Sequence, residues 1–342
     1  MIFSTSEVKV IYTWQTELWQ RWAGLRTRLP HAILLKGPQG VGKLDFAMTV
    51  AQSLLCKEPQ EGGLACESCP SCHWFLQQSH PDFRLIQPEI LSAQEEASES
   101  GKKPARQISV DQIRALMDFS TLSAHQGGYR VVLIHPAETM NASAANALLK
   151  TLEEPAGRML FILVTHKPQQ LPPTILSRCL ALAAPLPPPD ASIAWLKQQG
   201  LDDPSALLAQ AGFAPLQAAR LAEEAEDAGE YKRFLQEIGR PAQLDVFALA
   251  EQLQRTEPAK VIRWLQQWCY DLGSAKLAGK VLYHPNLVDA IQNLAAKIKV
   301  FDLLRYQKEL LAARREAAHP LNPRLQFESL LLAYRNMVVG NG

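Results

Sequence analysis

The chain has 342 residues, which is enough for two or three domains, and its hydrophobic content of 47% can supply a sizeable core. The formal net charge of +1 gives no overall signal for nucleic acid, so any DNA contact would be local or shared with partners. No run approaches the roughly 18 apolar residues of a membrane helix, and the N-terminus lacks the features of a signal peptide. We therefore expect a cytoplasmic protein with no membrane partner, whose six cysteines are thiols or metal ligands.

A glycine-rich loop follows the first expected strand. Residues 32–35 are apolar and lead into the loop, and residues 44–56 then have the apolar spacing of a helix. This is the context of a phosphate-binding loop of the form G-x-x-x-x-G-K-[ST], but Leu44 stands where a hydroxyl should hold Mg²⁺. Phosphate binding therefore stays open, beside the alternative that the loop only packs the start of the helix. The candidate binding residues of this degenerate loop are Gly37, Gly40, Gly42 and Lys43.

Four cysteines lie close together in the pattern C-x9-C-x2-C-x2-C. Thiolates at such short spacings suit tetrahedral zinc, and four of them complete the coordination shell, which indicates a structural site. A redox C-x-x-C pair and unpaired thiols are the alternatives. We predict a zinc module over residues 56–72. Its expected ligands are Cys56, Cys66, Cys69 and Cys72.

The next part of the chain alternates expected helices and strands. Residues 89–107 are rich in Glu, Ser, Ala, Lys and Pro, which predicts a solvated, mobile insertion. A helix should begin near Ser109, and residues 131–134 and 160–164 are continuous apolar runs typical of buried parallel strands. Between them, residues 141–153 have helical periodicity, with Asn141 as the expected N-cap. This alternation predicts an α/β domain with a parallel sheet covered on both faces.

A proline-rich stretch at residues 185–189 marks a linker. Beyond it we find no convincing buried strand, and residues 190–342 show helical periodicity. The clearest example is the series Val261, Trp264, Leu265 and Trp268. We therefore expect three domains, at residues 1–186, 187–228 and 229–342.

Three strings near the middle of the chain carry a family resemblance. Residues 141–155 read N-A-S-A-A-N-A-L-L-K-T-L-E-E-P, residues 161–165 read F-I-L-V-T, and residues 171–179 read L-P-P-T-I-L-S-R-C. The chain resembles the bacterial clamp loader subunits of the AAA+ class and, given its degenerate loop, their delta-prime branch in DNA polymerase III. The resemblance is clear over about residues 10–220 and weaker beyond. It implies a RecA-like AAA+ domain with a zinc insertion, then an all-α lid and an all-α collar.

The resemblance also implies partners. In this family the collar holds five subunits in an open ring, which opens the sliding clamp and places it on primed DNA. The expected partners are the motor (gamma/tau) and clamp-opening (delta) subunits of a hetero-pentamer, with the clamp and primed DNA contacted through the complex. The chain would not be an enzyme on its own, although the holoenzyme is a DNA-directed DNA polymerase, a nucleotidyltransferase.

The resemblance assigns roles to individual residues. It implies that Arg178, next to Ser177, is an arginine finger that acts in trans on ATP bound to a neighbour. From the residues alone, a surface arginine at a helix end is the alternative. His135 stands where active members hold the metal with Asp, and Leu44 lacks the hydroxyl, so we expect no ATP hydrolysis and leave ATP binding open. The predicted function is a non-hydrolysing stator; the alternatives are an ATP-hydrolysing motor subunit and a zinc-dependent DNA-binding scaffold.

Overall fold

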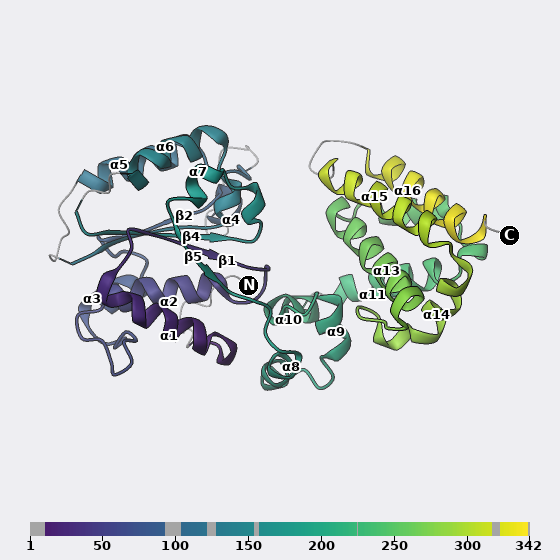
Figure 1. The fold of residues 1–342 in the computed structure, drawn as a ribbon, viewed down its shortest axis with the longest axis horizontal. Coiled ribbons are helices and arrows are strands. Elements are labelled where there is room, and N and C mark those ends of the chain that lie inside the picture. The colour runs from purple at the N-terminus through teal and green to yellow at the C-terminus, as the bar shows by residue number, and fades with distance from the viewer. Residues whose placement is uncertain are drawn as a thin grey trace. The chain divides into compact units, whose positions relative to one another are not determined.

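The chain divides into two compact units, Met1–Ala191 and Ser192–Gly342, which are treated separately (Figure 1). Within the described part, no helix is long and apolar enough to cross a membrane. The division falls after Ala191, whereas the predicted domain boundaries at residues 186 and 228 remain predictions. The computed structural model describes residues 11–92, 104–121, 128–153, 157–223, 225–316 and 322–340.

The first unit is built on a five-stranded parallel sheet with the strand order β2-β3-β4-β1-β5. The apolar runs at residues 32–35, 131–134 and 160–164 are its three central strands, as predicted. The two edge strands were not predicted, because each has only four residues and one of them is largely exposed. The strands are β1 (Ala32–Lys36), β2 (Phe83–Ile86), β3 (Arg130–Ile134), β4 (Met159–Thr165) and β5 (Leu180–Ala183).

Helices cover both faces of this sheet, with α1, α2 and α3 on one face and α5, α6 and α7 on the other (Figure 1). Side chains of β1 alternate between the two layers, as a strand requires. Ile33 and Leu35 lie beside Trp22 of α1, whereas Leu34 belongs to the cluster that contains Leu148 of α6. The helices are α1 (Thr16–Leu25), α2 (Lys43–Leu55), α3 (Pro70–Leu76), α4 (Glu89–Ser92), α5 (Val110–Thr121), α6 (Ala142–Glu153) and α7 (Pro173–Leu176).

Two local predictions concern the start of α6 and the insertion at residues 89–107. Asn141 is the N-cap of α6 as expected, since its Oδ1 accepts a hydrogen bond from the backbone N of Ala144 at 2.8 Å. The insertion is not all loop, because its start forms α4, and Glu89 accepts from the backbone N of Ala105 at 2.9 Å. The residues at 93–103, on which the prediction of mobility rests, lie outside the described ones.

The described residues of the second unit form helices and their connections, without a strand, as predicted. One small cluster of buried residues joins Leu196, Leu208 and Ala218. A larger cluster surrounds α13 and contains the predicted series of Val261, Trp264, Leu265 and Trp268, all of them buried. The helices are α8 (Pro189–Gln198), which begins in the first unit, α9 (Ser205–Gln210), α10 (Pro215–Glu223), α11 (Ala225–Ile238), α12 (Val246–Leu253), α13 (Pro258–Ala278), α14 (Val288–Lys297), α15 (Val300–Glu316) and α16 (Pro323–Val339).

Candidate nucleotide and zinc sites

The degenerate phosphate loop joins the end of β1 to the start of α2, the position at which parallel sheets bind ligands. Gly42 is the N-cap residue of α2 and has a φ of +82°, in the left-handed region. A Cβ atom at Gly42 would lie 2.5 Å from the ring of Tyr12, and one at Gly37 would lie 2.0 Å from the carbonyl oxygen of Ala184. Both glycines are therefore required by close packing around the loop, independently of any phosphate.

Lys43 is turned onto its own loop. Its Nζ donates a hydrogen bond to the carbonyl oxygen of Gly37 at 2.8 Å and another to that of Pro38. The residue is only 2% exposed, and burial lowers the pKa of its ammonium group to about 8, partly opposed by the charge of Glu138. A phosphate would have to take this ammonium group away from two backbone carbonyls.

The residues before α1 lie against the same loop. Tyr12 stacks on Trp14 with ring centroids 4.8 Å apart, and its hydroxyl donates to the Asp45 carboxylate at 2.7 Å. Gln15 and Trp14 each donate from a side-chain N–H to the carbonyl oxygen of Val41, both at 3.1 Å. The N-terminal segment is thus fastened to the loop and to the first turn of α2. Nothing in the spacing of these residues predicts this contact.

The positions that should hold a metal ion have other partners. His135 follows β3, and its Nδ1 lies 3.1 Å from Nε2 of Gln87. The carboxylate oxygens of Glu138 accept from the backbone N of His166 at 3.1 and 3.3 Å. With hydrocarbon at Leu44 and an imidazole at His135, these two positions lack the hydroxyl and carboxylate that hold Mg²⁺ in an active site.

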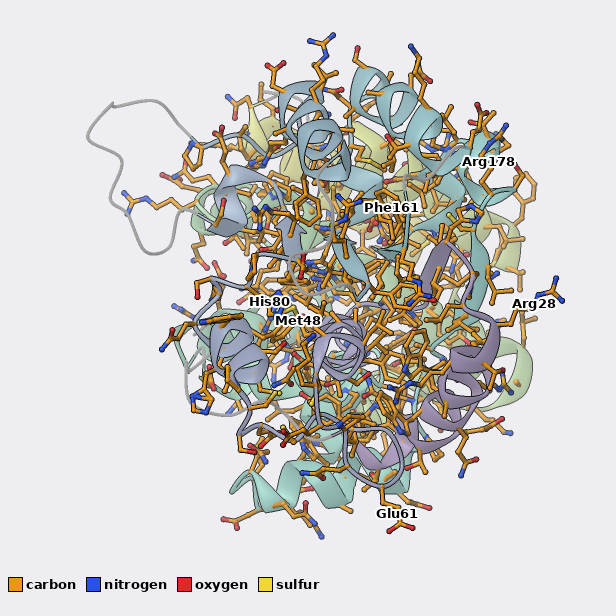
Figure 2. All side chains as sticks on the ribbon, turned by 90° about the vertical axis from the view of Figure 1, so that its left-hand side faces the viewer. Arg28, Met48, Glu61, His80, Phe161 and Arg178 are labelled. Atoms are coloured by element: carbon orange, nitrogen blue, oxygen red, sulfur yellow. The ribbon has the colours of Figure 1, made fainter. Side chains whose placement is uncertain are left out.

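Ser177 and Arg178 directly follow α7, and Figure 2 shows Arg178 at the surface. The Arg178 side chain is 34% exposed, and its Nη2 makes an ion pair of 2.5 Å with Glu153, whose side chain is 50% exposed. Its Nη1 donates to the carbonyl oxygen of Thr174 at 3.0 Å and to Ser177 Oγ at 3.4 Å. The guanidinium is thus held in one orientation at the surface, and its role as a finger stays a prediction.

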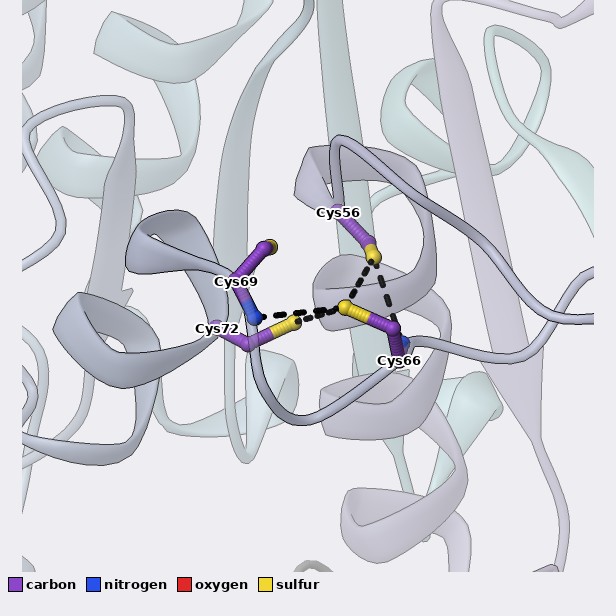
Figure 3. A group of neighbouring side chains, drawn as sticks. All are labelled: Cys56, Cys66, Cys69 and Cys72. Atoms are coloured by element: carbon purple, nitrogen blue, oxygen red, sulfur yellow. Dashed lines mark hydrogen bonds between the residues drawn. The ribbon is translucent and has the colours of Figure 1, made fainter.

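The four predicted zinc ligands come together (Figure 3). Their sulfur atoms all lie within 4.8 Å of one another, with Cys56 and Cys66 at 3.5 Å and Cys66 and Cys72 at 3.9 Å. Tetrahedral zinc with four bonds of about 2.3 Å places its sulfur ligands roughly 3.8 Å apart. Cys56 follows α2, and Cys69 and Cys72 lie at the start of α3. The arrangement fits a zinc ion, with all four ligands supplied by the protein.

Hydrogen bonds to sulfur support this arrangement. The backbone N of Cys66 donates to Cys56 Sγ at 3.2 Å, and the backbone N of Cys69 donates to Cys66 Sγ at 3.3 Å. Hydrogen bonds from Ser68 lower the pKa of the Cys66 thiol to about 6, whereas burial raises the pKa of Cys72. The protein's own hydrogen bonds therefore favour the thiolate form at Cys66. At Cys72, the charge of a bound cation would have to stabilise the thiolate that the metal needs.

Comparison with known proteins places the chain in a family. A family model described as DNA polymerase III, delta subunit, matches residues 14–186, and one described as its C-terminal part matches residues 226–336. The delta-prime subunit of DNA polymerase III from Pseudomonas aeruginosa is 35% identical over 96% of this chain and 98% of its own length.

The chain belongs to the delta-prime family of DNA polymerase III subunits. The delta-prime subunit of Yersinia pestis is also similar, at 30% identity over 89% of each chain. Among solved structures, a gamma subunit-related protein of Thermotoga maritima covers 94% of this chain and 99% of its own at 17% identity, with a TM-score of 0.45, too low to support a conclusion. The family models and the two delta-prime relatives confirm the family predicted from the three central strings.

In this member of the delta-prime family the predicted residues form three separate groups: the loop, the cysteines, and Ser177 with Arg178. Prediction from sequence missed the partners that surround them. No motif in the sequence indicates that Tyr12 and Gln15 lie at the loop or that Glu153 pairs with Arg178.

Proposed function

We propose that this chain is a non-hydrolysing stator subunit of the DNA polymerase III clamp loader and has no enzyme activity of its own. The observation that carries the proposal is the state of its phosphate loop. Lys43 is bonded to carbonyls of its own loop, and the metal-holding positions carry Leu44 and His135. Phosphoryl transfer depends on a metal ion and a cation that neutralise the developing charge, so their loss or diversion at one site disables hydrolysis.

The cation that contributes to catalysis would act away from this chain's own phosphate loop. In this proposal Arg178 reaches the γ-phosphate of ATP bound to a neighbouring subunit, as an arginine finger in trans. Its surface position and its pairing with a half-exposed carboxylate support this role, since a phosphate can replace Glu153 as the partner of the guanidinium. Fingers of this kind contribute about 10³ to 10⁵ in rate.

The partners in this proposal are the motor (gamma/tau) and clamp-opening (delta) subunits of a cytoplasmic hetero-pentamer, with the sliding clamp and primed DNA reached through the complex. The surface of α15 supports such an assembly. Phe301, Leu304 and Leu311 lie along one side of the helix and are 76%, 58% and 55% exposed. Leu303 and Leu310, on the other side, are buried in the core of the second unit. A helix with apolar residues on both sides suits a subunit contact.

The cysteine cluster would have a structural role. We assign it a structural zinc ion, because the sulfur distances match a closed tetrahedral site with no open position for a reaction. The ion would stabilise the module at residues 56–72, whose buried cluster comprises little beyond the cysteines and Ala65.

The experiment is reconstitution of the complex from this chain, the motor subunit and the clamp-opening subunit, followed by measurement of DNA-stimulated ATPase. Arg178→Ala should lower hydrolysis at the neighbouring subunit's ATP site by about 10³ or more without preventing assembly, so the total rate should fall by the share that this site contributes. Arg28→Ala removes another exposed arginine of the first unit and should leave the rate unchanged. An unchanged rate with Arg178→Ala would remove the finger from the proposal.

Two measurements on the isolated chain test the alternatives. ATP hydrolysis in the presence of Mg²⁺ would favour a motor subunit, whereas a stator should show none. Tight binding to DNA in a gel-shift assay would favour a DNA-binding scaffold, whereas a stator should bind DNA poorly when alone.

A further inference from the structure

A buried chain of hydrogen bonds lies beside the cysteine cluster. The backbone N of Asp82 donates to Nδ1 of His80 at 3.0 Å, and Nε2 of His80 lies 2.8 Å from the hydroxyl oxygen of Ser71. That hydroxyl donates to the carbonyl oxygen of Leu55 at 2.7 Å. Ser71 is 1% and His80 is 3% exposed, so both depend on protein partners rather than on water.

The direction of donation along these hydrogen bonds follows from the bond that Nδ1 of His80 accepts. Because Nδ1 of His80 accepts a backbone N–H, the neutral ring carries its proton on Nε2. Nε2 therefore donates to Ser71 Oγ, which leaves the hydroxyl proton of Ser71 for the carbonyl of Leu55. Within this series, Nδ1 of His80 accepts and Nε2 donates, and the Ser71 hydroxyl accepts from His80 and donates to Leu55.

Two members of this series of hydrogen bonds, called the relay below, lie next to the predicted metal ligands. Leu55 is the last residue of α2 and directly precedes Cys56. Ser71 is in the first turn of α3, between Cys69 and Cys72. The Ser71 hydroxyl thus joins the two chain segments that supply three of the four thiols, and His80 ties the junction to the residues that lead into β2.

We propose that Ser71 and His80 are positioning residues that hold the cysteine cluster in the geometry of its metal and slow the loss of that metal. This inference rests on the zinc site proposed above. Neither side chain belongs to the group of four cysteine ligands. Both act by fixing the backbone on either side of this cluster. Outer residues that hydrogen-bond directly to metal ligands typically change metal affinity by about 10- to 100-fold, and residues that fix the backbone of the ligands act in the same direction.

Two substitutions of His80 separate the relay from simple packing. Asparagine places its amide near Nδ1, so His80→Asn can keep a partner for the backbone N of Asp82 but cannot reach Ser71. Glutamine places its amide nitrogen near Nε2, so His80→Gln can still donate to Ser71. Ser71→Ala removes the hydroxyl itself. Ser53→Ala is the matched control, because Ser53 is equally buried and donates only to Val50 in its own helix.

The measurement is the rate of zinc transfer from the purified full chain to a chromophoric chelator, after the zinc content of each variant has been determined by emission spectroscopy. We expect Ser71→Ala and His80→Asn to lose zinc about 10- to 100-fold faster than wild type. His80→Gln and Ser53→Ala should stay close to the wild-type rate.

The outcomes are distinguishable. Wild-type rates for Ser71→Ala and His80→Asn would overturn the relay and leave the zinc site standing, and equally fast loss from His80→Gln and His80→Asn would assign the effect to ring packing instead. A wild-type chain that neither contains nor takes up zinc would overturn the zinc site and the relay together.

Discussion

The buried carboxylate of Asp271 in α13 organises the loop that follows this helix, and its removal should loosen the second unit. The side chain is fully buried and accepts from the backbone N of Leu282 at 2.8 Å and of Tyr283 at 3.0 Å. It also accepts from His284 twice, through the backbone N at 2.9 Å and through Nδ1 at 2.8 Å. His284 in turn lies 2.8 Å from the hydroxyl of Tyr231 in α11, so the network joins two helices through one loop.

The magnitude follows from the donors that Asp271→Ala would leave behind. Both hydrogen bonds from His284 are buried, and hydrogen bonds to charged groups contribute about 1.5 to 3 kcal/mol each. The half-buried donors of Leu282 and Tyr283 can turn partly to water and add less. We expect the free energy of unfolding of the second unit to fall by about 3 to 6 kcal/mol, a large part of the roughly 5 to 15 kcal/mol that stabilises a domain.

Hydrogen exchange measured peptide by peptide on the full chain can test this expectation. Protection in peptides from residues 258–297 should fall by a factor of about 10² or more, because each 1.4 kcal/mol corresponds to about tenfold. Protection in the sheet of the first unit serves as an internal reference. Asp289→Ala, at an exposed position on α14, should change stability by only about 0.5 kcal/mol. Unchanged protection in Asp271→Ala would refute the assignment of this network as a main support of the unit.

The same carboxylate predicts a pH dependence. Burial by itself raises the pKa of Asp271, but hydrogen bonds from His284 and from the backbone of Leu282 and Tyr283 outweigh it, and the net pKa lies below its ordinary value. A lowered folded-state pKa gives stability that is present above the ordinary value of about 4 and is lost as the pH falls through the folded-state value. Protection should therefore decline below about pH 4 in the wild type, and Asp271→Ala should lack this component.

Three further predictions concern the first unit. Cys66→Ser removes one thiolate, so zinc content should fall to near zero and trypsin should cleave the module at residues 56–72 more quickly, which emission spectroscopy and timed digestion would show. Gly42→Ala sets a methyl group 2.5 Å from the Tyr12 ring at a φ of +82°, and should cost about 1 to 3 kcal/mol, visible as a lower melting temperature. Burial lowers the pKa of Lys43 from 10.5 to about 8, so wild-type stability should rise between these pH values, and urea titrations of Lys43→Met should lack that rise.

Elements with a strong local signal could be predicted from the sequence. The central strands β1, β3 and β4 are continuous apolar runs because both of their faces are buried between helix layers. The start of α6 was also predictable, since an asparagine cap acts on backbone groups within its own turn. The edge strands β2 and β5 were not, because a short strand with exposed positions has no continuous apolar run to detect.

Residue identity alone indicates which metal ligands the two candidate sites can offer. A leucine at position 44 and a histidine at 135 cannot supply the oxygen ligands of an active metal site in any conformation, and the cysteine spacing named a tetrahedral ligand set. The tertiary structure decided which partners these residues meet. Arg178 meets Glu153, 25 positions away, and Tyr12 meets Asp45, 33 positions away. Such pairs carry no periodicity in the sequence, because they form only when the sheet and its helices bring distant segments together.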